Sequence, residues 1–310
     1  MLIDTGAGQH AGISSAEGGR RLEERSSPVL LRWVLGEWLR EIRDACGLTG
    51  SEVARRLGWA PSKVSRIENH EGVSPGDVRE LLDAYGITNP DDVRPLVEMA
   101  RHAQQRGWWQ GYGDVLPPWF ATFVGLETGA AEERDYKGAL VTGLLQTPDY
   151  ARAVMGAAVP GGPPPPGELE RLIALRLERQ QLLHHSADAL KLWAVLDEAV
   201  LRRRVGGAAV MRHQLRHLAD LSQAPNITIQ VLPEDQVHPA LDFPFCMLLF
   251  RDHQRLPGLV YLENFRKTLH LEDGEDMKYY SAAFDGLTRA ALSPGQSRDL
   301  VRQHLKAIDE

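Results

Sequence analysis

The chain has 310 residues, of which 43% are hydrophobic and 25% are charged, and its formal net charge is -7. This composition is ordinary for a globular protein, and the length predicts two domains. The sequence has no apolar stretch near the ~20 residues that span a bilayer, no secretory signal at its start and no zinc-ligand spacing around its two cysteines. We therefore expect a cytoplasmic protein that has no membrane association, no metal site and no cofactor.

Residues 1–28 are predicted to form a disordered arm. They are rich in Gly, Ser, Ala and charged residues, and they include few large apolar ones. Such a segment buries too little apolar surface to offset the entropy that is lost when it becomes ordered.

Four short helical segments follow the arm. The first helix ends near Gly47, and the second begins after Thr49, a favourable N-cap, and stops at Gly58. The third is PSKVSRIE, in which proline takes the first helical position, where its missing N–H costs nothing. The fourth follows the Ser-Pro pair at 74–75, and together the four segments predict a compact all-α domain at 29–88.

A further helix is expected at 89–110, where it connects the two domains, and Pro95 should delay its start or kink it. Residues 111–310 mix helical and strand patterns, with helical character expected over 119–136. The proline-rich octet at 160–167 is expected to be an exposed loop. Five strand-like segments follow it: 189–197, 226–233, 242–250, 258–265 and 267–273. This part is predicted to be an α+β domain with a mainly antiparallel sheet.

The second and third helices fit a helix-turn-helix over residues 50–69. That motif needs a small residue where its two helices cross and a glycine with positive φ in the turn. Ala54 falls at the crossing and Gly58 falls in the turn. The positions that should be buried are apolar: Val53, Leu57, Trp59, Val64 and Ile67. A helical hairpin with no role in nucleic-acid binding is the alternative interpretation.

The charge around this motif favours DNA binding. Residues 53–67 include four basic residues and no acidic one, although the chain as a whole is acidic. Charge within a Debye length of the contact, ~8 Å at physiological salt, matters more than the remote total. We therefore predict that the helix from Pro61 to Glu68 enters the major groove of double-stranded DNA.

The start of the third helix should point into the groove. Ser62 and Lys63 are therefore expected to contact bases, and Arg66, one turn later, is expected to reach guanine or phosphate. Asn69, just past the helix, is expected to touch the DNA backbone.

The second helix should contribute phosphate contacts. Its start offers free N–H groups and the positive end of the helix dipole at Thr49, Gly50 and Ser51. Of Arg55 and Arg56, one is expected to face phosphate and the other to pair with an acidic neighbour. The full predicted set of DNA-binding residues is Thr49, Gly50, Ser51, Arg55, Pro61, Ser62, Lys63, Ser65, Arg66 and Asn69.

The surrounding domain is not basic, because residues 29–88 carry eight Lys and Arg against nine Asp and Glu. A single domain with few phosphate contacts binds DNA weakly. We therefore expect a homodimer on an inverted-repeat operator, with half-sites about one helical turn apart.

The stretch LGEWLREIRDACGLTGSEVARRLGWAPSKVSRIE, residues 35–68, resembles the xenobiotic-response-element (XRE) family of bacterial regulators. The resemblance implies a five-helix fold of the Cro and λ-repressor type, the Cro/C1-type helix-turn-helix, and a role in transcription regulation. That family often carries glutamine directly after the threonine that opens the second helix, where it contacts phosphate or a base. Gly50 takes that position here, so a contact there has to come from the backbone or from Ser51.

The rest of the chain resembles the C-terminal domain of uncharacterised function that accompanies such motifs in actinobacterial regulators. The segments that carry this resemblance include RGWWQGYGDVLPPWFATFVGLE, LVTGLLQTPDYARAV, LWAVLDEAVLRR and AFDGLTRAALSP. Members of that group are implicated in developmental and secondary-metabolite control, and a small partner protein is often encoded beside them. The resemblance leaves open what the domain senses.

The second domain is not expected to be an enzyme. The sequence lacks the HExxH, GxGxxG and GxxxxGK[ST] signatures of zincins, dinucleotide sites and P-loops. Asp197, Glu198 and Glu263 follow strand-like segments and could converge for acid–base work, but helix capping and ion pairs explain them more simply.

Two hypotheses for the second domain remain. An apolar pocket for a small-molecule effector could be lined by aromatic residues: Trp108, Trp109, Trp119, Trp193, Phe243, Phe245 and Phe250. The alternative is an antitoxin-like protein-interaction module whose DNA binding is only autoregulatory. The predicted organisation is a disordered arm (1–28), a helix-turn-helix DNA-binding domain (29–88), a connecting helix (89–110) and an α+β regulatory or interaction domain (111–310).

Overall fold

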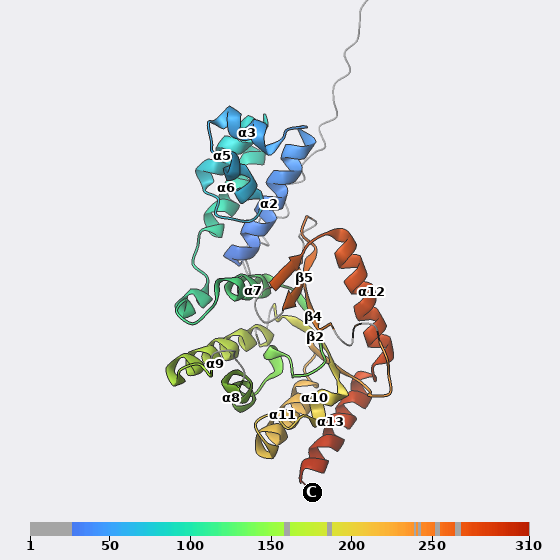
Figure 1. The fold of residues 1–310 in the computed structure, drawn as a ribbon. Coiled ribbons are helices and arrows are strands. Elements are labelled where there is room, and N and C mark those ends of the chain that lie inside the picture. Colours follow the sequence, from blue (N-terminus) through green and yellow to red (C-terminus); the bar gives the residue numbers. More distant parts are fainter. Residues whose placement is uncertain are drawn as a thin grey trace, which may run out of the picture. The chain divides into compact units, whose positions relative to one another are not determined.

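A computed structural model describes residues 27–157, 162–184, 188–238, 240, 243–251, 255–263 and 268–309. The chain divides into two units, residues 1–105 and residues 106–310 (Figure 1). The predicted arm lies outside the described residues except for Ser27 and Pro28, and part of the predicted proline-rich loop does so as well. Within the described ranges, no helix is both long enough and apolar enough to cross a membrane.

The helices of the first unit begin and end at the residues that the sequence indicates. Thr49 caps the second helix of the unit through reciprocal hydrogen bonds with Glu52, and Gly58 ends it in the left-handed conformation, with φ of 65°. Pro61 and Pro75 each begin a helix, as predicted. The helices are α2 (Pro28–Ala45), α3 (Gly50–Leu57), α4 (Pro61–Glu68), α5 (Pro75–Ala84) and α6 (Pro90–Ala103).

Helix α6 differs from the predicted connecting helix in extent and packing. It begins at Pro90 and runs through Pro95, so Pro95 does not delay its start. Leu96 and Met99 are buried, and the helix packs against α2 and α5. Because two neighbours cover its apolar face, α6 is the last helix of the bundle, within residues 1–105.

The second unit is an α+β fold. Its α-helices are α7 (Pro118–Gly129), α8 (Pro148–Ala157), α9 (Pro166–Gln180), α10 (Glu198–Arg202), α11 (Ala208–Leu221), α12 (Gly274–Ala290) and α13 (Pro294–Asp309). Short 3-10 helices are η1 (Trp108–Tyr112), η2 (Gly143–Leu145) and η3 (Gln181–Leu183). The strands are β1 (Glu132–Lys137), β2 (Lys191–Asp197), β3 (Ile227–Leu232), β4 (Phe245–Leu249), β5 (Gly258–Glu263) and β6 (Thr268–Leu271).

These strands form one sheet in the order β3-β2-β1-β4-β5-β6. The pairs β1–β2 and β2–β3 are parallel. The pairs β1–β4, β4–β5 and β5–β6 are antiparallel. The predicted fold class, a helical helix-turn-helix domain followed by an α+β domain with a mainly antiparallel sheet, is confirmed.

The sequence-based prediction is wrong at the central strand β1. Residues 119–136 are expected to be helical, but α7 ends at Gly129 and β1 follows at once. The strand has the sequence EERDYK, in which five of six residues are charged. It pairs with β2 on one side and with β4 on the other. Pairing with distant segments therefore makes a strand of residues whose composition does not indicate one.

Alternation along β1 gives the sheet two unlike faces. Tyr136 belongs to an apolar core with Val195 and Phe245, and this core includes Phe284 and Leu287 of α12. Glu133 and Asp135 lie on the opposite face. Figure 1 shows α12 along one side of the sheet, and α7 and α9 on the other side.

Candidate nucleic-acid interface

Helices α3 and α4 pack through the residues that the motif requires. Val53, Ala54, Val64 and Ile67 are buried, and Gly58 has the positive φ that the turn needs. The other two predicted core residues, Leu57 and Trp59, are only half-buried. The packing of a helix-turn-helix is therefore present, and the Trp59 side chain remains partly exposed.

Helix α4 begins without a side-chain cap. Each of the other helices of the first unit is capped by a side-chain oxygen, from Ser27, Thr49, Ser74 or Asn89. Ala60, which precedes α4, offers no such acceptor. Pro61 has no N–H, and the N–H of Ser62 has no acceptor among the described residues. The start of α4 therefore presents an unsatisfied donor and the positive end of the helix dipole to solvent.

An exposed row of four predicted residues runs along α4, which we term the α4 stripe: Ser62, Ser65, Arg66 and Asn69. Their spacing of three, one and three residues places them on one helix face. Asn69 Nδ2 donates a hydrogen bond to Ser65 Oγ at 3.2 Å. The Arg66 side chain makes no hydrogen bond or ion pair with any other residue that the structure describes, so its guanidinium is free for an external partner.

Lys63, in contrast, is engaged within the first unit. Its Nζ lies 2.5 Å from Asp77 Oδ1 on α5 and 3.7 Å from the centroid of the Trp59 ring. Trp59 is held in turn, because its Nε1 donates to Glu80 Oε2 at 3.1 Å. In this conformation the charge of Lys63 is neutralised by Asp77, so the expectation that it contacts bases stays a prediction.

Asp77 has a second role, as part of the cap of α5. Its Oδ2 accepts hydrogen bonds from the N–H and the hydroxyl of Ser74, at 3.0 and 2.7 Å. Burial is the strongest single influence on the pKa of Asp77 and raises it, but the hydrogen bonds from Lys63 and Ser74 together outweigh burial and leave the pKa below its ordinary value. Asp77 is therefore held as the anion that binds Lys63.

The start of α3 already holds a carboxylate. Thr49 N–H donates to Glu52 Oε2 at 2.8 Å, and Glu52 N–H donates to Thr49 Oγ1 at 3.2 Å. The bonds from the Thr49 backbone and side chain lower the pKa of Glu52. The N–H groups of Gly50 and Ser51 remain without an acceptor within the described chain, so these two are the donors that a phosphate could reach.

Arg55 and Arg56 are both exposed in the last turn of α3. Arg56 Nη1 lies 3.5 Å from the carbonyl oxygen of Ala84. Neither arginine forms an ion pair with an acidic residue of the described ranges, although one of them was expected to do so. With Arg66, the motif thus presents three exposed guanidinium groups that no carboxylate contacts directly.

An ion pair that joins α4 to α2 was missed by the sequence analysis. Arg43 Nε and Nη2 lie 2.7 and 2.9 Å from the two carboxylate oxygens of Glu68. Arg40 Nη2 also donates to the carbonyl oxygen of Glu68 at 2.7 Å. These contacts fix the end of α4 against α2. No local pattern could have indicated them, because the partners lie 25 positions apart in sequence.

The three carboxylates weighed for acid–base work do not converge in the second unit. Asp197 caps α10 by accepting from the N–H of Ala199 at 2.8 Å. Glu198 lies 3.2 Å from His304 Nε2. Glu263 ends β5, which is separated from β2 by β1 and β4. The simpler explanation, helix capping, is confirmed for Asp197.

The aromatic residues proposed to line one pocket are divided between the two faces of the sheet. Trp108 packs against Trp109 and donates to Thr128 Oγ1 of α7. Trp193 packs against Phe284 of α12, on the other face. The predicted aromatic pocket is therefore not formed by this set.

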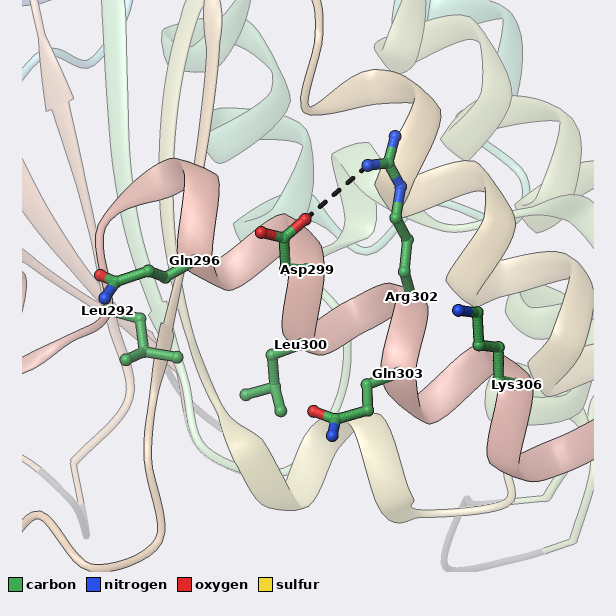
Figure 2. Close-up of a pocket in the computed structure, with 7 residues that line it drawn as sticks. All are labelled: Leu292, Gln296, Asp299, Leu300, Arg302, Gln303 and Lys306. Atoms are coloured by element: carbon green, nitrogen blue, oxygen red, sulfur yellow. Dashed lines mark ion pairs between the residues drawn. The ribbon is translucent and has the colours of Figure 1, made fainter.

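A hollow of about 550 Å³ lies along α13 (Figure 2). The residues that line it are Leu292, Gln296, Asp299, Leu300, Arg302, Gln303 and Lys306. Its charged and amide side chains are all exposed, and Arg302 faces Asp299 at 3.8 Å. Because solvent already satisfies these groups, the hollow contains no buried group that requires a ligand.

The fold and the α4 surface define a class of protein, and comparison with known families agrees. Residues 34–96 match a family model described as a helix-turn-helix domain, which indicates DNA binding and, with it, transcription regulation. Residues 120–303 match the model described as "Domain of unknown function (DUF5753)". That match spans more than half of the chain, so the chain belongs to this family. No curated protein and no solved structure matches the chain significantly.

Proposed function

We propose that the protein is a homodimeric, sequence-specific transcriptional regulator of the XRE type found in actinobacteria, and that it reads the major groove with the α4 stripe. The observation that carries the proposal is Arg66, an exposed guanidinium without a partner among the described residues, on the same helix face as Ser62 and next to an uncapped helix start. An arginine in this setting matches the paired acceptors of guanine or a phosphate.

The proposed contacts divide into two kinds. Ser62, Ser65 and Arg66 face base edges, because they lie on the exposed side of the helix that enters the groove. Phosphates are bound by Arg55 and by the free N–H groups of Gly50 and Ser51. Lys63 joins them only by exchanging Asp77 for a phosphate.

Dimerisation follows from the small number of these contacts. Few phosphate contacts give weak binding at physiological salt, and two copies on an inverted repeat add their free energies. We propose that the second unit controls this association, in response to an effector or a small protein partner, and that its activity is binding and not catalysis. Sedimentation of the purified chain should show a dimer that prefers the full repeat to a half-site. A monomer with equal affinity for both would contradict the proposal.

Substitutions on the α4 stripe test the interface itself. The probe is the DNA upstream of the protein's own gene, or the duplex selected from a random pool. Arg66→Ala should lower the affinity about fivefold or more, since a base-reading contact is worth about 1–3 kcal/mol. Arg101→Ala is the matched control, because Arg101 is exposed on α6 and pairs only with Glu98 of its own helix. Unchanged binding by a folded Arg66→Ala variant would remove α4 as the reading helix.

A further inference from the structure

The charged face of the sheet in the second unit contains side chains that folding alone does not explain. Glu133 and Asp135 lie on the central strand and are 2% and 1% exposed. Transfer of an ionised carboxylate to such a position costs several kcal/mol unless a partner compensates. We therefore identify the partner of each charged group on this face. A charged group without a partner indicates a place where a ligand of opposite charge could bind.

Two cations on this face are neutralised. Arg179 of α9 forms a fork with Glu127 of α7, with Nε and Nη2 at 2.7 and 2.5 Å from the two carboxylate oxygens. Lys137 Nζ lies 3.1 Å from Asp135 Oδ1 on the same strand. Each of these pairs satisfies the charge of both members.

Glu133 remains, and its surroundings favour the neutral acid. Burial, followed by the neighbouring carboxylates of Glu127 and Asp135, raises its pKa well above the ordinary value. With Glu133 neutral, Glu127 and Asp135 are already paired with Arg179 and Lys137, and Glu263, exposed at the end of β5, acts on Arg176 without forming an ion pair. The third cation of this face therefore has no carboxylate in direct contact among the described residues.

That cation is Arg176. Its Nη1 donates to Gln146 Oε1, a neutral acceptor. Its Nε is buried and has no acceptor, and no carboxylate of the described ranges lies within ion-pair distance of it. Burial, and then repulsion from Arg179, lowers the pKa of Arg176 to about 9. The side of the guanidinium formed by Nε and Nη2 is therefore an unused fork, the geometry that binds a carboxylate or a phosphate.

The loop that faces this fork is held rigidly by three glutamine side chains. Gln146 Nε2 donates to the carbonyl oxygen of Val141 at 2.7 Å. Gln180 Nε2 donates to those of Gly143 and Gln146, at 3.0 and 2.8 Å. Gln214 binds the loop at both the carbonyl oxygen of Leu145 and the N–H of Thr147. Buried amides that hold a backbone segment in this way preorganise it.

Gly143 lies beside the fork. A Cβ at this position would lie 3.6 Å from Arg176 Nε and 3.6 Å from Arg179 Nη1. A longer side chain at this position would contact both guanidinium groups. Tyr261 adds a further group, because its hydroxyl is buried on the same face without a hydrogen-bond partner. Phe123 of α7 packs on its ring at 4.2 Å between centroids.

We propose that Arg176 is the anchor of a binding site for a small anionic molecule, whose carboxylate or phosphate group is held by the Nε–Nη2 fork beside Gly143. The polar remainder of the ligand meets the Tyr261 hydroxyl and Glu133. This site gives the second unit a ligand of defined chemistry. The part of the proposal that concerns regulation rests on the proposed DNA binding, whereas ligand binding itself is measured without DNA.

The first test is thermal unfolding of the full chain in concentration series of inorganic phosphate and of acetate, with chloride at matched ionic strength as reference. A ligand of the folded state raises Tm with its concentration. We expect at least one of the two anions to do so beyond chloride, and the responding anion identifies the phosphoryl or the carboxylate class. If neither does, the site does not exist.

Variants locate the effect. Arg176→Lys keeps the charge but removes the fork, and it should weaken the response tenfold or more. Arg302→Gln, at an exposed arginine of α13, should respond as the wild type does. Arg66→Ala distinguishes phosphate bound at the start of α4 from phosphate bound at Arg176. Binding at the α4 start would depend on Arg66 and not on Arg176. A wild-type response in Arg176→Lys would overturn the proposal.

A second measurement does not depend on any ligand. Arg176→Met removes a half-buried cation that lacks an anionic partner, together with its hydrogen bond to Gln146 Oε1, so in chloride buffer its Tm should stay close to that of the wild type. A strong loss of stability would mean that the chain itself satisfies this guanidinium, and that no external anion is needed.

Discussion

In the first unit, three arginines that lack a carboxylate partner lie in solvent around the helix-turn-helix: Arg55, Arg56 and Arg66. In the second unit, Arg176 also lacks one, but it is half-buried between α9 and the loop of residues 141–147, with its Nε fully covered. An exposed guanidinium keeps its water and costs the fold little, which suits a long polyanion that approaches from outside. An enclosed one has lost its water, so it suits a fitted anion of small size. The same residue type thus indicates two different kinds of ligand.

The largest effect should come from Glu127→Gln in the second unit. This substitution leaves Arg179 buried beside Arg176 with no anionic partner, and breaking a buried pair in this way costs about 3–5 kcal/mol. Chemical denaturation of the full chain, followed through the transition of the second unit, measures the loss.

Glu170→Gln is the matched control, because Glu170 pairs with Arg152 at the surface. It should leave the free energy of unfolding unchanged. If Glu127→Gln also left the free energy of unfolding unchanged, burial would not be what separates the Arg179–Glu127 pair from a surface pair.

The stability of the first unit should depend more on the turn at Gly58 than on its ion pairs. Gly58→Ala places a side chain at φ of 65° with no atom within 4 Å of its Cβ, so strain alone acts. The expected loss of stability is about 1 kcal/mol. Gly72→Ala, where the added Cβ also meets open space but φ is not positive, should change stability very little. Equal losses would show that the left-handed turn is not what the motif depends on.

The smallest effect should come from Asp77→Asn. Asparagine at position 77 can still accept a hydrogen bond from Ser74, the N-cap of α5, but it releases Lys63, which adds a cation to the DNA-facing surface. The salt dependence of DNA binding should then steepen by about one unit of slope, and non-specific affinity should rise. Fluorescence anisotropy across a potassium chloride series measures both. If Lys63→Ala flattens the slope in the otherwise wild-type chain, Lys63 has already exchanged Asp77 for a phosphate on DNA.

The same pair predicts a dependence of stability on pH. The pKa of Asp77 lies below its ordinary 3.8 in the folded state, so the pair stabilises the first unit above about pH 4. This stabilisation is lost as the pH falls through the folded-state pKa, where Asp77 takes up a proton. The difference in Tm between the wild type and Asp77→Asn should therefore disappear in acid. A difference that persists there would assign the effect to the cap and not to the ion pair.

The first unit could be predicted in detail because local residues determine it. Thr49, Gly58, Pro61 and Ser74 each act within a few positions of themselves, through caps, a left-handed turn or a fixed φ. The five strands beyond residue 188 were also predicted, because their apolar content is typical of buried strands.

Features that depend on distant partners could not be predicted. The strand β1 has a charged sequence, and only pairing with β2 and β4 makes it a strand. Likewise, the positions of Lys63 and Arg176 depend on Asp77, 14 residues away, and on Gln146, 30 residues away. The sequence placed Ser62, Ser65 and Arg66 on the third helix and Asn69 just past it, as the structure does, but which of the predicted residues are engaged internally could be seen only in the fold.

The missing cap of α4 links DNA binding to local folding. A first turn that lacks an acceptor opens more readily than the capped turns around it, so its amides should exchange hydrogen sooner than those of α3. A phosphate bound at that end supplies the acceptor, and completing a cap stabilises a helix by about 1 kcal/mol. Operator DNA then supplies the missing N-terminal cap of α4, and we expect the first turn of this helix to become fully ordered only when DNA is bound.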